Sequence, residues 1–331
     1  MHDRQAITAI SAPPGQDDQE PDGVLAFDIG GTRIKAGLVH GAAVSSLTVV
    51  PTLESNGSDL IETIVRVGRD VLAARKAPAV GISIKGIVEP QRGTLLDVNA
   101  VLMPWIGRPF AEIIRDRMQL PTRVENDARM FALGESVHGA ARGHRNAVCL
   151  TLGTGVGCGV ILDGRILQGG HGAAGILGGH VIVQVGGRPC TCGGEGCLEA
   201  YIGTEGLLKT VRETLARGTS STLNEQPLTP KKVFEAAAEG DRVAQDVVQQ
   251  FATYLGAGIV TLVHVFDPDV IVVGGGIAHA SLVFLPSVQA YVDSHAWTIP
   301  RARVRVVPAI LGDAAALVGA AELARGAIVE A

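Results

Sequence analysis

The chain has 331 residues, of which 47% are apolar and 18% are charged, and its formal net charge is −5. This composition is typical of a well-buried globular protein, and the length favours two domains over a single core. The sequence contains no block of Lys and Arg. Nucleic acid is therefore not expected as a partner, because duplex binding requires clustered cations.

Residues 1–22 are predicted to be a disordered tail, because the apolar patch at 6–12 is short for a signal peptide and acidic residues follow it. The uncharged stretch 251–266 falls short of the roughly 20 apolar residues that span a bilayer. A buried core helix is expected there, with no membrane partner. The five cysteines are expected to be reduced thiols in the cytoplasm and not a disulfide framework.

The first half of the chain alternates between strand and helix patterns. Apolar runs on both sides of a glycine turn predict two strands over 24–39. A helical stripe behind Ser58, the expected N-cap, predicts a helix over 58–76. A strand at 79–84, a helix at 109–118 opened by Pro109, a strand at 122–126 and a helix at 127–138 follow.

The second half begins in the same way. Two strands around a glycine turn are expected over 146–167, with a hairpin turn at Asp163 and Gly164. Helices are predicted at about 204–216, 230–239 (capped by Thr229), 241–264 and 313–325. A buried strand over 268–278 ends in glycines.

The two glycine-turn segments resemble each other. "GTRIKAGLV" from Gly31 and "GTGVGCGVI" from Gly153 both have Gly-Thr first, Gly seventh and two apolar residues after it. Although apolar hairpins can look alike by chance, a duplicated α/β domain with a central cleft is the more economical account. The expected units are 23–140, completed by the C-terminal helix 313–331, and 141–312.

Both glycine turns are candidates for phosphate binding, since no Cβ blocks the approach of an anion to the backbone amides. A strand and not a helix follows each turn, which disfavours a dinucleotide site. Two such turns facing one cleft suit a nucleoside triphosphate, although each alone can be an ordinary hairpin. Asp28, just before Gly30, Gly31 and Thr32, could hold Mg²⁺ through water.

Five segments, in this order, resemble the ROK family of sugar kinases and sugar-responsive repressors: "FDIGGTRIKAGLV", "VENDARMFALGE", "LGTGVGCGVILDG", "CTCGGEGCLEA" and "DPDVIVVGGGIA". The resemblance covers residues 24 to about 325. It implies two actin-like (ribonuclease H-like) α/β domains around a cleft, ATP with Mg²⁺ as cofactors, a small-molecule sugar as substrate, and a homodimer.

Cys190, Cys192 and Cys197 lie within one glycine-rich loop. Three thiolates need a fourth ligand for a closed tetrahedral Zn²⁺ site. His180 in "GGH", ahead of a predicted strand "VIV", resembles the family's zinc-binding histidine, so the loop 180–199 is expected to bind structural zinc. Buried or redox-active thiols are the alternative. In the family, the equivalents of His180 and Glu199 also reach sugar hydroxyls.

The resemblance assigns the chemistry to "END" at 125–127. A kinase acting on an alcohol needs a carboxylate that accepts the hydroxyl proton, and Asp127 matches the family's base while Asn126 matches a sugar ligand. From the residues alone, Asn-Asp between a strand and a helix is more often an N-cap. Asn99 also matches a sugar-binding residue. The remaining matched turn residues are expected beside ATP: Gly153, Thr154, Gly155, Gly274, Gly275 and Gly276, although a glycine run can also serve tight packing.

Three positions depart from the family pattern. Leu177 stands where a sugar-binding glutamate is usual, Lys85 replaces a proline, and Arg129 replaces an asparagine. Both cations are expected at the sugar end of the cleft, where they would suit an unusual or acidic sugar, unless the changes are neutral.

Three functions compete. An ATP-dependent hexose kinase acting on O6, similar to glucokinases, is the preferred hypothesis. A repressor would carry an N-terminal winged helix, for which the residues before Val24 offer no pattern. A catalytically silent sugar-binding protein is the third hypothesis, and Leu177 supports it.

Overall fold

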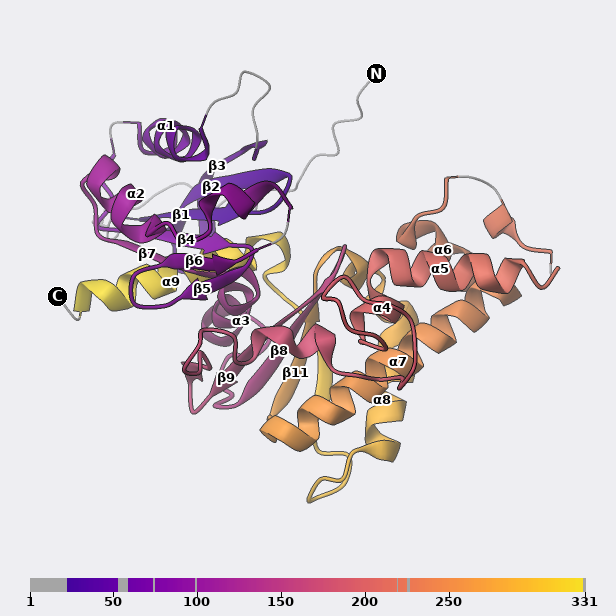
Figure 1. Ribbon diagram of the computed structural model, residues 1–331. Coiled ribbons are helices and arrows are strands. Elements are labelled where there is room, and N and C mark those ends of the chain that lie inside the picture. The colour runs from indigo at the N-terminus through magenta and orange to yellow at the C-terminus, as the bar shows by residue number, and fades with distance from the viewer. Residues whose placement is uncertain are drawn as a thin grey trace, which may run out of the picture.

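The computed structural model describes residues 23–52, 59–73, 75–98, 100–218, 220–224 and 227–329. Figure 1 shows two α/β halves side by side, with the C-terminal helix α9 (Ala315–Val329) returning to the first half. The predicted tail 1–22 and Asn99 lie outside the described residues.

The first half contains a five-stranded sheet in the order β3-β2-β1-β4-β7. β1 pairs antiparallel with β2 and β2 with β3, whereas β1, β4 and β7 are parallel. The strands are β1 (Val24–Ile29), β2 (Arg33–His40), β3 (Ala43–Pro51), β4 (Val80–Ile84) and β7 (Thr122–Asn126). A separate two-stranded pair, β5 (Ile87–Glu89) and β6 (Thr94–Asp97), and a 3-10 helix η1 (Ala100–Trp105) follow β4.

Helices cover both faces of this sheet because side chains alternate along each strand. Leu25, Phe27 and Ile29 of β1 share a core with α1 (Leu60–Leu72) and α2 (Phe110–Met118). The intervening Val24 and Ala26 share a core with α9 on the opposite face. The buried strands are therefore almost continuously apolar.

The second half repeats this design, with strands in the order β10-β9-β8-β11-β12. β8 pairs antiparallel with β9, and parallel with β11, which is parallel to β12. The strands are β8 (Ala147–Leu152), β9 (Val156–Leu162), β10 (Arg165–Ile166), β11 (Val270–Gly274) and β12 (Arg305–Pro308). The same sequence of antiparallel and parallel neighbours in both sheets is what a duplicated domain predicts.

The helices of the second half are α4 (Glu199–Ile202), α5 (Thr204–Leu215), α6 (Pro230–Ala238), α7 (Arg242–Phe266) and α8 (Ser281–His295). Short 3-10 helices η2 (Ile176–His180), η3 (Thr222–Asn224), η4 (Gly276–Ala280) and η5 (Gly312–Ala314) connect them. Among the described helices, α7 alone is long and apolar enough, by length and composition, to cross a membrane. Phe251, Leu255 and Ile259 of α7 lie in the core of the second half, so the helix has the role of a core helix here.

Two helices join the halves. α3 (Asp127–His138) packs on β8 and β9 of the second sheet, although the sequence places it in the first unit, and α9 packs on β1 and β4 of the first. α3 and α9 also pack against each other. They approach closely because a Cβ at Gly134 would collide with the Ala315 carbonyl, and one at Gly319 with the Met130 carbonyl.

The predicted elements are present with small shifts, and two predictions are wrong. α1 begins at Leu60 with Asp59, not Ser58, at its N-cap, and Ser58 lies outside the described residues. The segment "VIV" forms no strand, only an isolated bridge between Ile182 and Cys197. Several elements were not predicted from the sequence: β3, β5, β6, β10 as a separate strand, α4, α8 and β12.

Candidate active site

Asp127 lies at the carboxyl edge of the first sheet. Ile29, Ile84 and Asn126 are aligned at the ends of the parallel strands β1, β4 and β7. The residues that follow them, Gly30, Lys85 and Asp127, therefore emerge side by side. Ligands of open α/β sheets bind outside this edge.

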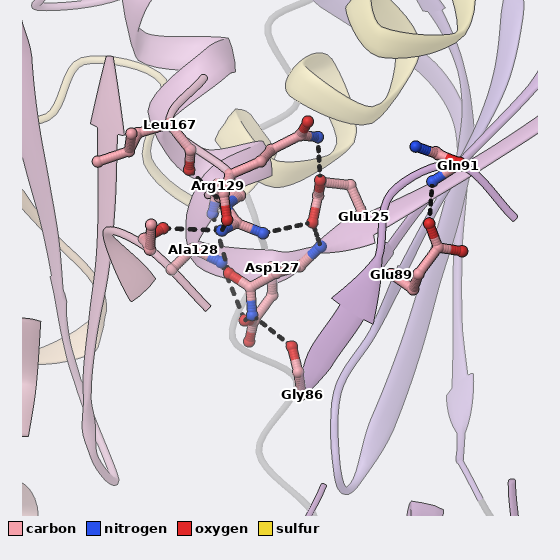
Figure 2. A network of polar contacts seen from close by, with 11 residues as sticks. Gly86, Glu89, Gln91, Glu125, Asp127, Ala128, Arg129 and Leu167 are labelled. Atoms are coloured by element: carbon pink, nitrogen blue, oxygen red, sulfur yellow. Dashed lines mark hydrogen bonds and ion pairs between the residues drawn. The ribbon is translucent and has the colours of Figure 1, made fainter. Parts of the chain in front are cut away.

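Asn126 and Asp127 form the first turn of α3. Asn126 is the N-cap, since its Oδ1 accepts a hydrogen bond from the Arg129 amide (3.1 Å). Its Nδ2 donates to the Gly86 carbonyl (2.8 Å) and to Asp127 Oδ1 (3.0 Å). Asp127 Oδ1 also accepts from the Ala128 amide (2.9 Å). Figure 2 shows these contacts around Asp127, which fix one carboxylate oxygen.

Burial and, after it, the charge of Asp28 raise the pKa of Asp127 to about 6, against smaller opposing effects that include the charge of Lys85. A carboxylate with such a pKa is ionised at neutral pH and still basic enough to accept a proton. Asp127 can therefore act as a general base.

Asp28, on β1, is a candidate ligand for a metal cation. Its Oδ1 accepts a hydrogen bond from Ser83 Oγ (2.9 Å), and its Oδ2 is 4.0 Å from Lys35 Nζ. Burial raises the pKa of Asp28. A half-buried carboxylate next to a glycine turn offers the hard oxygen ligands that Mg²⁺ prefers.

The first glycine turn is closed by the bond from the Gly30 amide to the Arg33 carbonyl (2.9 Å). Thr52 stabilises this turn with two hydrogen bonds: its Oγ1 donates to the Gly30 carbonyl (2.7 Å), and its amide donates to the Thr32 carbonyl (3.0 Å). Within the described parts of the chain, the amides of Gly31 and Thr32 have no acceptor. These exposed amides can donate to an anion.

The second glycine turn is held by the helices that follow the cysteine loop. The Gly153 carbonyl accepts from both the amide and Oγ1 of Thr204 (2.9 Å each). Glu199 Oε2 accepts from the Val156 amide (2.9 Å), and a Cβ at Gly155 would collide with this oxygen. In the described chain, the amides of Thr154 and Gly155 have no acceptor either.

The turns and Asp127 are linked through α3. Gly157, two residues beyond the second turn, packs against Ala128, the residue after Asp127. Gly274 pairs with Thr151, and the backbone of Leu152 leaves no room for a Cβ at Gly275. Gly275 and Gly276 therefore lie beside the second turn, and close packing alone already explains Gly275.

The predicted metal ligands come together. The nitrogen or sulfur atoms of His180, Cys190, Cys192 and Cys197 all lie within 4.8 Å of one another. Cys190 Sγ is 3.5 Å from His180 Nδ1, and Cys192 Sγ is 3.7 Å from Cys197 Sγ. Ligands at about 2.3 Å from a tetrahedral Zn²⁺ would be about 3.8 Å apart, so the donor set fits zinc.

Glu199 connects this cluster to the second turn. Its Oε1 accepts a hydrogen bond from Thr191 Oγ1 (3.0 Å) and lies 4.0 Å from Cys190 Sγ, while its Oε2 accepts from the Val156 amide. The cysteine loop thereby positions a carboxylate next to the glycine turn.

Arg129, expected as a cation at the sugar end of the cleft, does not present its charge to a ligand. Its side chain is fully buried and pairs with Glu125 (3.0 Å), also buried. Its remaining N–H groups donate to the carbonyls of Leu167, Gln168 and Ala174 (3.0, 3.1 and 2.7 Å). Figure 2 shows the guanidinium group of Arg129 between Glu125 and Leu167. The guanidinium group of Arg129 therefore holds the segment after β10 against α3 by hydrogen bonds.

The other two residues that differ from the family pattern, Lys85 and Leu177, are accessible to a ligand. Lys85 is half-buried, and Leu177 is 47% exposed in η2, three residues before His180. Four residues that support the site were not predicted: Glu125, Gln168, Ser83 and Thr204. No local pattern indicated these contacts; even the i, i+4 rule for helices does not apply to Glu125 and Arg129, since Glu125 lies on β7 and Arg129 on α3.

Comparison with known proteins gives a consistent result. The chain matches the ROK family over residues 24–327. It is 34% identical to a glucokinase from Halalkalibacterium halodurans over 314 residues, covering 89% of this chain and 92% of that protein. It is 35% identical to a glucokinase from Streptomyces coelicolor over 322 residues, covering 91% and 97%.

The fold matches a crystal structure of a ROK family glucokinase from Streptomyces griseus in complex with glucose and AMPPNP. The TM-score is 0.77 and the sequence identity 32%, and the match covers 92% of this chain and 99% of that one.

Proposed function

We propose that this chain, which belongs to the ROK family and is a carbohydrate kinase with two actin-like domains, transfers the terminal phosphoryl group of ATP to O6 of a hexose, with Asp127 as the general base. The observation that carries this proposal is the position of Asp127. This carboxylate, whose pKa is raised to about 6, stands at the same sheet edge as Asp28 and the first glycine turn.

In the proposed reaction, Asp127 accepts the proton of the sugar hydroxyl while the hydroxyl oxygen bonds to the terminal phosphorus. Oδ1 is engaged by Asn126 and Ala128, so Oδ2 is the oxygen we assign to the proton. Phosphoryl transfer depends mainly on positioning and on charge stabilisation. The free amides of Gly31, Thr32, Thr154 and Gly155 supply donors for the phosphates, and Asp28 supplies an oxygen for Mg²⁺.

The proposed sugar contacts are Asn99, Asn126, Asp127, His180 and Glu199, and Gly275 and Gly276 are assigned to the adenosine end. Both N–H groups of Asn126 already have partners. Its main role is thus to orient Asp127, and only its Oδ1 can receive a sugar hydroxyl. Zinc, bound by His180, Cys190, Cys192 and Cys197, would hold Glu199 in place and take no part in the reaction.

A second candidate is binding of a sugar without turnover. The observation in its favour is Leu177, whose exposed apolar side chain stands where the resemblance leads one to expect a carboxylate. A site that lacks this acceptor leaves a sugar hydroxyl less well bound by about 1–3 kcal/mol.

The test is ADP release over a panel of hexoses, amino sugars and sugar acids, with a 6-deoxy sugar as a control for O6. Asp127→Asn keeps the size of the side chain but removes the proton acceptor, so we expect kcat to fall by about 10²–10⁴-fold. The Kd for sugar should stay within about tenfold of the parent value. Asp163→Asn, an exposed change in a hairpin turn, is the matched control. Phosphorylation of no sugar would favour the silent binder, and an unchanged kcat would place the base elsewhere.

We further propose that the enzyme is a cytoplasmic homodimer that binds no nucleic acid. The family resemblance supports the dimer, the free thiols of Cys190, Cys192 and Cys197 favour a reducing compartment, and the net charge of −5 disfavours DNA. Light scattering at working concentration checks the dimer, and a salt-dependent titration with duplex DNA checks the last point.

A further inference from the structure

Lys85 occupies the middle position of the site. The parallel strands lie in the order β1-β4-β7, with Ile29, Ile84 and Asn126 in register. The next residues form a row: Gly30 opens the first glycine turn, Lys85 follows β4, and Asp127 follows β7. Neighbouring strands are about 4.8 Å apart, so the lysine stands between the turn and the base.

The ammonium group of Lys85 has no partner in the described parts of the chain, where neither a carboxylate nor another acceptor lies within bonding distance. Lys35, the other lysine of this edge, lies 4.0 Å from Asp28 and 3.9 Å from Asp313. Lys85 is half-buried, and its charge opposes the rise in the pKa of Asp127, so the two groups interact. A partly buried ammonium group that makes no ion pair with the described residues is unfavourable, which fits a group whose partner is an anionic ligand.

The backbone around Lys85 is fixed on both sides. Its amide donates to the Ile29 carbonyl (3.2 Å), which ties it to the strand ahead of the glycine turn. The carbonyl of the next residue, Gly86, accepts from Asn126 Nδ2 (2.8 Å), which also holds Asp127. Figure 2 shows Gly86 reaching this cluster. The side chain therefore projects from a rigid base.

We propose that Lys85 is a further catalytic residue, whose ammonium group binds the phosphoryl group as it passes from nucleotide to sugar. This inference rests on the proposed kinase reaction and names a group that the resemblance does not supply, since the family has proline there.

In the transfer, the bond between the terminal phosphorus and the bridging oxygen breaks, and its electron pair stays on ADP. A bond from the sugar oxygen to the phosphorus forms, and the hydroxyl proton goes to Asp127. Lys85 keeps its proton throughout and neutralises charge on the oxygens of the transferred group, the interaction that usually contributes most to such reactions.

The test compares Lys85→Met, which keeps the stem but removes the charge, with Lys85→Arg, which keeps the charge. Lys209→Met, an exposed position on α5, is the matched control. We expect Lys85→Met to lower kcat by about 10²–10³-fold, with the KM for sugar nearly unchanged and the thermal midpoint close to that of the parent. Lys85→Arg should recover most of the loss.

A second readout needs no turnover. ADP with aluminium fluoride imitates the transferring group, so the parent should bind it more tightly than ADP alone in the presence of glucose, and Lys85→Met should lose this difference. An unchanged kcat, or a rise only in the KM for sugar, would overturn the proposal. If the parent phosphorylates no sugar, the kinase proposal fails. The binding comparison still tests the role of Lys85 separately. If Lys85→Met weakens the binding of ADP alone as much as that of ADP with aluminium fluoride, the proposed role of Lys85 is rejected.

Discussion

Arg129 Nη1 lies 3.0 Å from Glu125 Oε1, and the side chains of both residues are shielded from solvent (0% and 1% exposed). Every other bonded partner of the guanidinium is a backbone carbonyl, and Gln168 Nε2 donates to the second carboxylate oxygen of Glu125 (2.7 Å). This pair joins β7 and α3, which bear Asp127, to the segment that leads from β10 into η2 (Figure 2). Both side chains are buried, so their role is to hold the segments of the site together.

Arg129→Met should destabilise the protein strongly. It leaves Glu125 buried without a counter-ion and the carbonyls of Leu167 and Ala174 without their donor, whereas the Gln168 carbonyl keeps the Ala174 amide. Breaking a buried pair typically costs about 3–5 kcal/mol. Urea unfolding measures the change. Arg115→Met, which breaks the exposed pair with Asp116, should cost no more than about 1 kcal/mol. Adding Glu125→Gln to Arg129→Met should recover part of the loss, and equal effects of the two single arginine variants would refute this account.

Only substitutions of the four clustered residues should cause the protein to lose zinc. Purified protein is expected to contain close to one zinc ion per chain by metal analysis, and Cys192→Ser should lose it, because three ligands bind less tightly than a closed set of four. Cys149→Ala is the control, since Cys149 is buried in β8 away from the cluster. Metal-free protein from a chelator-free preparation would rule out the site.

The pH dependence should report Asp127. A base acts only when deprotonated, and burial, followed by the charge of Asp28, raises the pKa of Asp127 to about 6. We therefore expect kcat/KM to rise with pH and to reach half its plateau near pH 6. An acidic limb near pH 4, where an exposed aspartate titrates, would contradict the burial of this carboxyl in the free enzyme.

Asp127→Asn should also stabilise the fold at neutral pH. Because the pKa of Asp127 is higher in the folded protein than its ordinary value of 3.8, the folded state holds this proton more tightly than the unfolded chain. Stability therefore falls as pH rises from about 4 to 6 and the charged form predominates. The neutral variant avoids this penalty, so its free energy of unfolding at pH 7 should exceed that of the parent, while the two should converge near pH 3. A less stable variant at pH 7 would show that the carboxylate contributes to folding.

Much of this architecture could be predicted from the sequence, for identifiable reasons. The strands that were predicted are short apolar runs ended by glycine or polar residues, and the predicted helices follow apolar stripes such as the buried face of α1. β3 was missed because it is an edge strand with mostly exposed or half-buried side chains, so it lacks a buried run. α8 was missed because Pro286 interrupts its pattern, although the helix continues through it.

Some features of the candidate site could likewise be predicted from the sequence, and others could not. The cysteine spacing and the strand-to-helix position of Asp127 are local signals, and the structure brings the four proposed zinc ligands together. The partners of Arg129 are distant carbonyls at 167, 168 and 174. No local pattern encodes such contacts, so the sequence could reveal the charge of Arg129 but not its burial.

The close crossing of α3 and α9 has a consequence for which mutations the protein can accept. At Gly134 and Gly319, the backbone of the opposite helix fills the space that any side chain would need. Even alanine would force the helices apart, and since one lies on each sheet, the two lobes would tilt relative to each other. In a saturation scan selected for activity, these two glycines should therefore be as intolerant as Asp127, although their role is only to let the two helices pack.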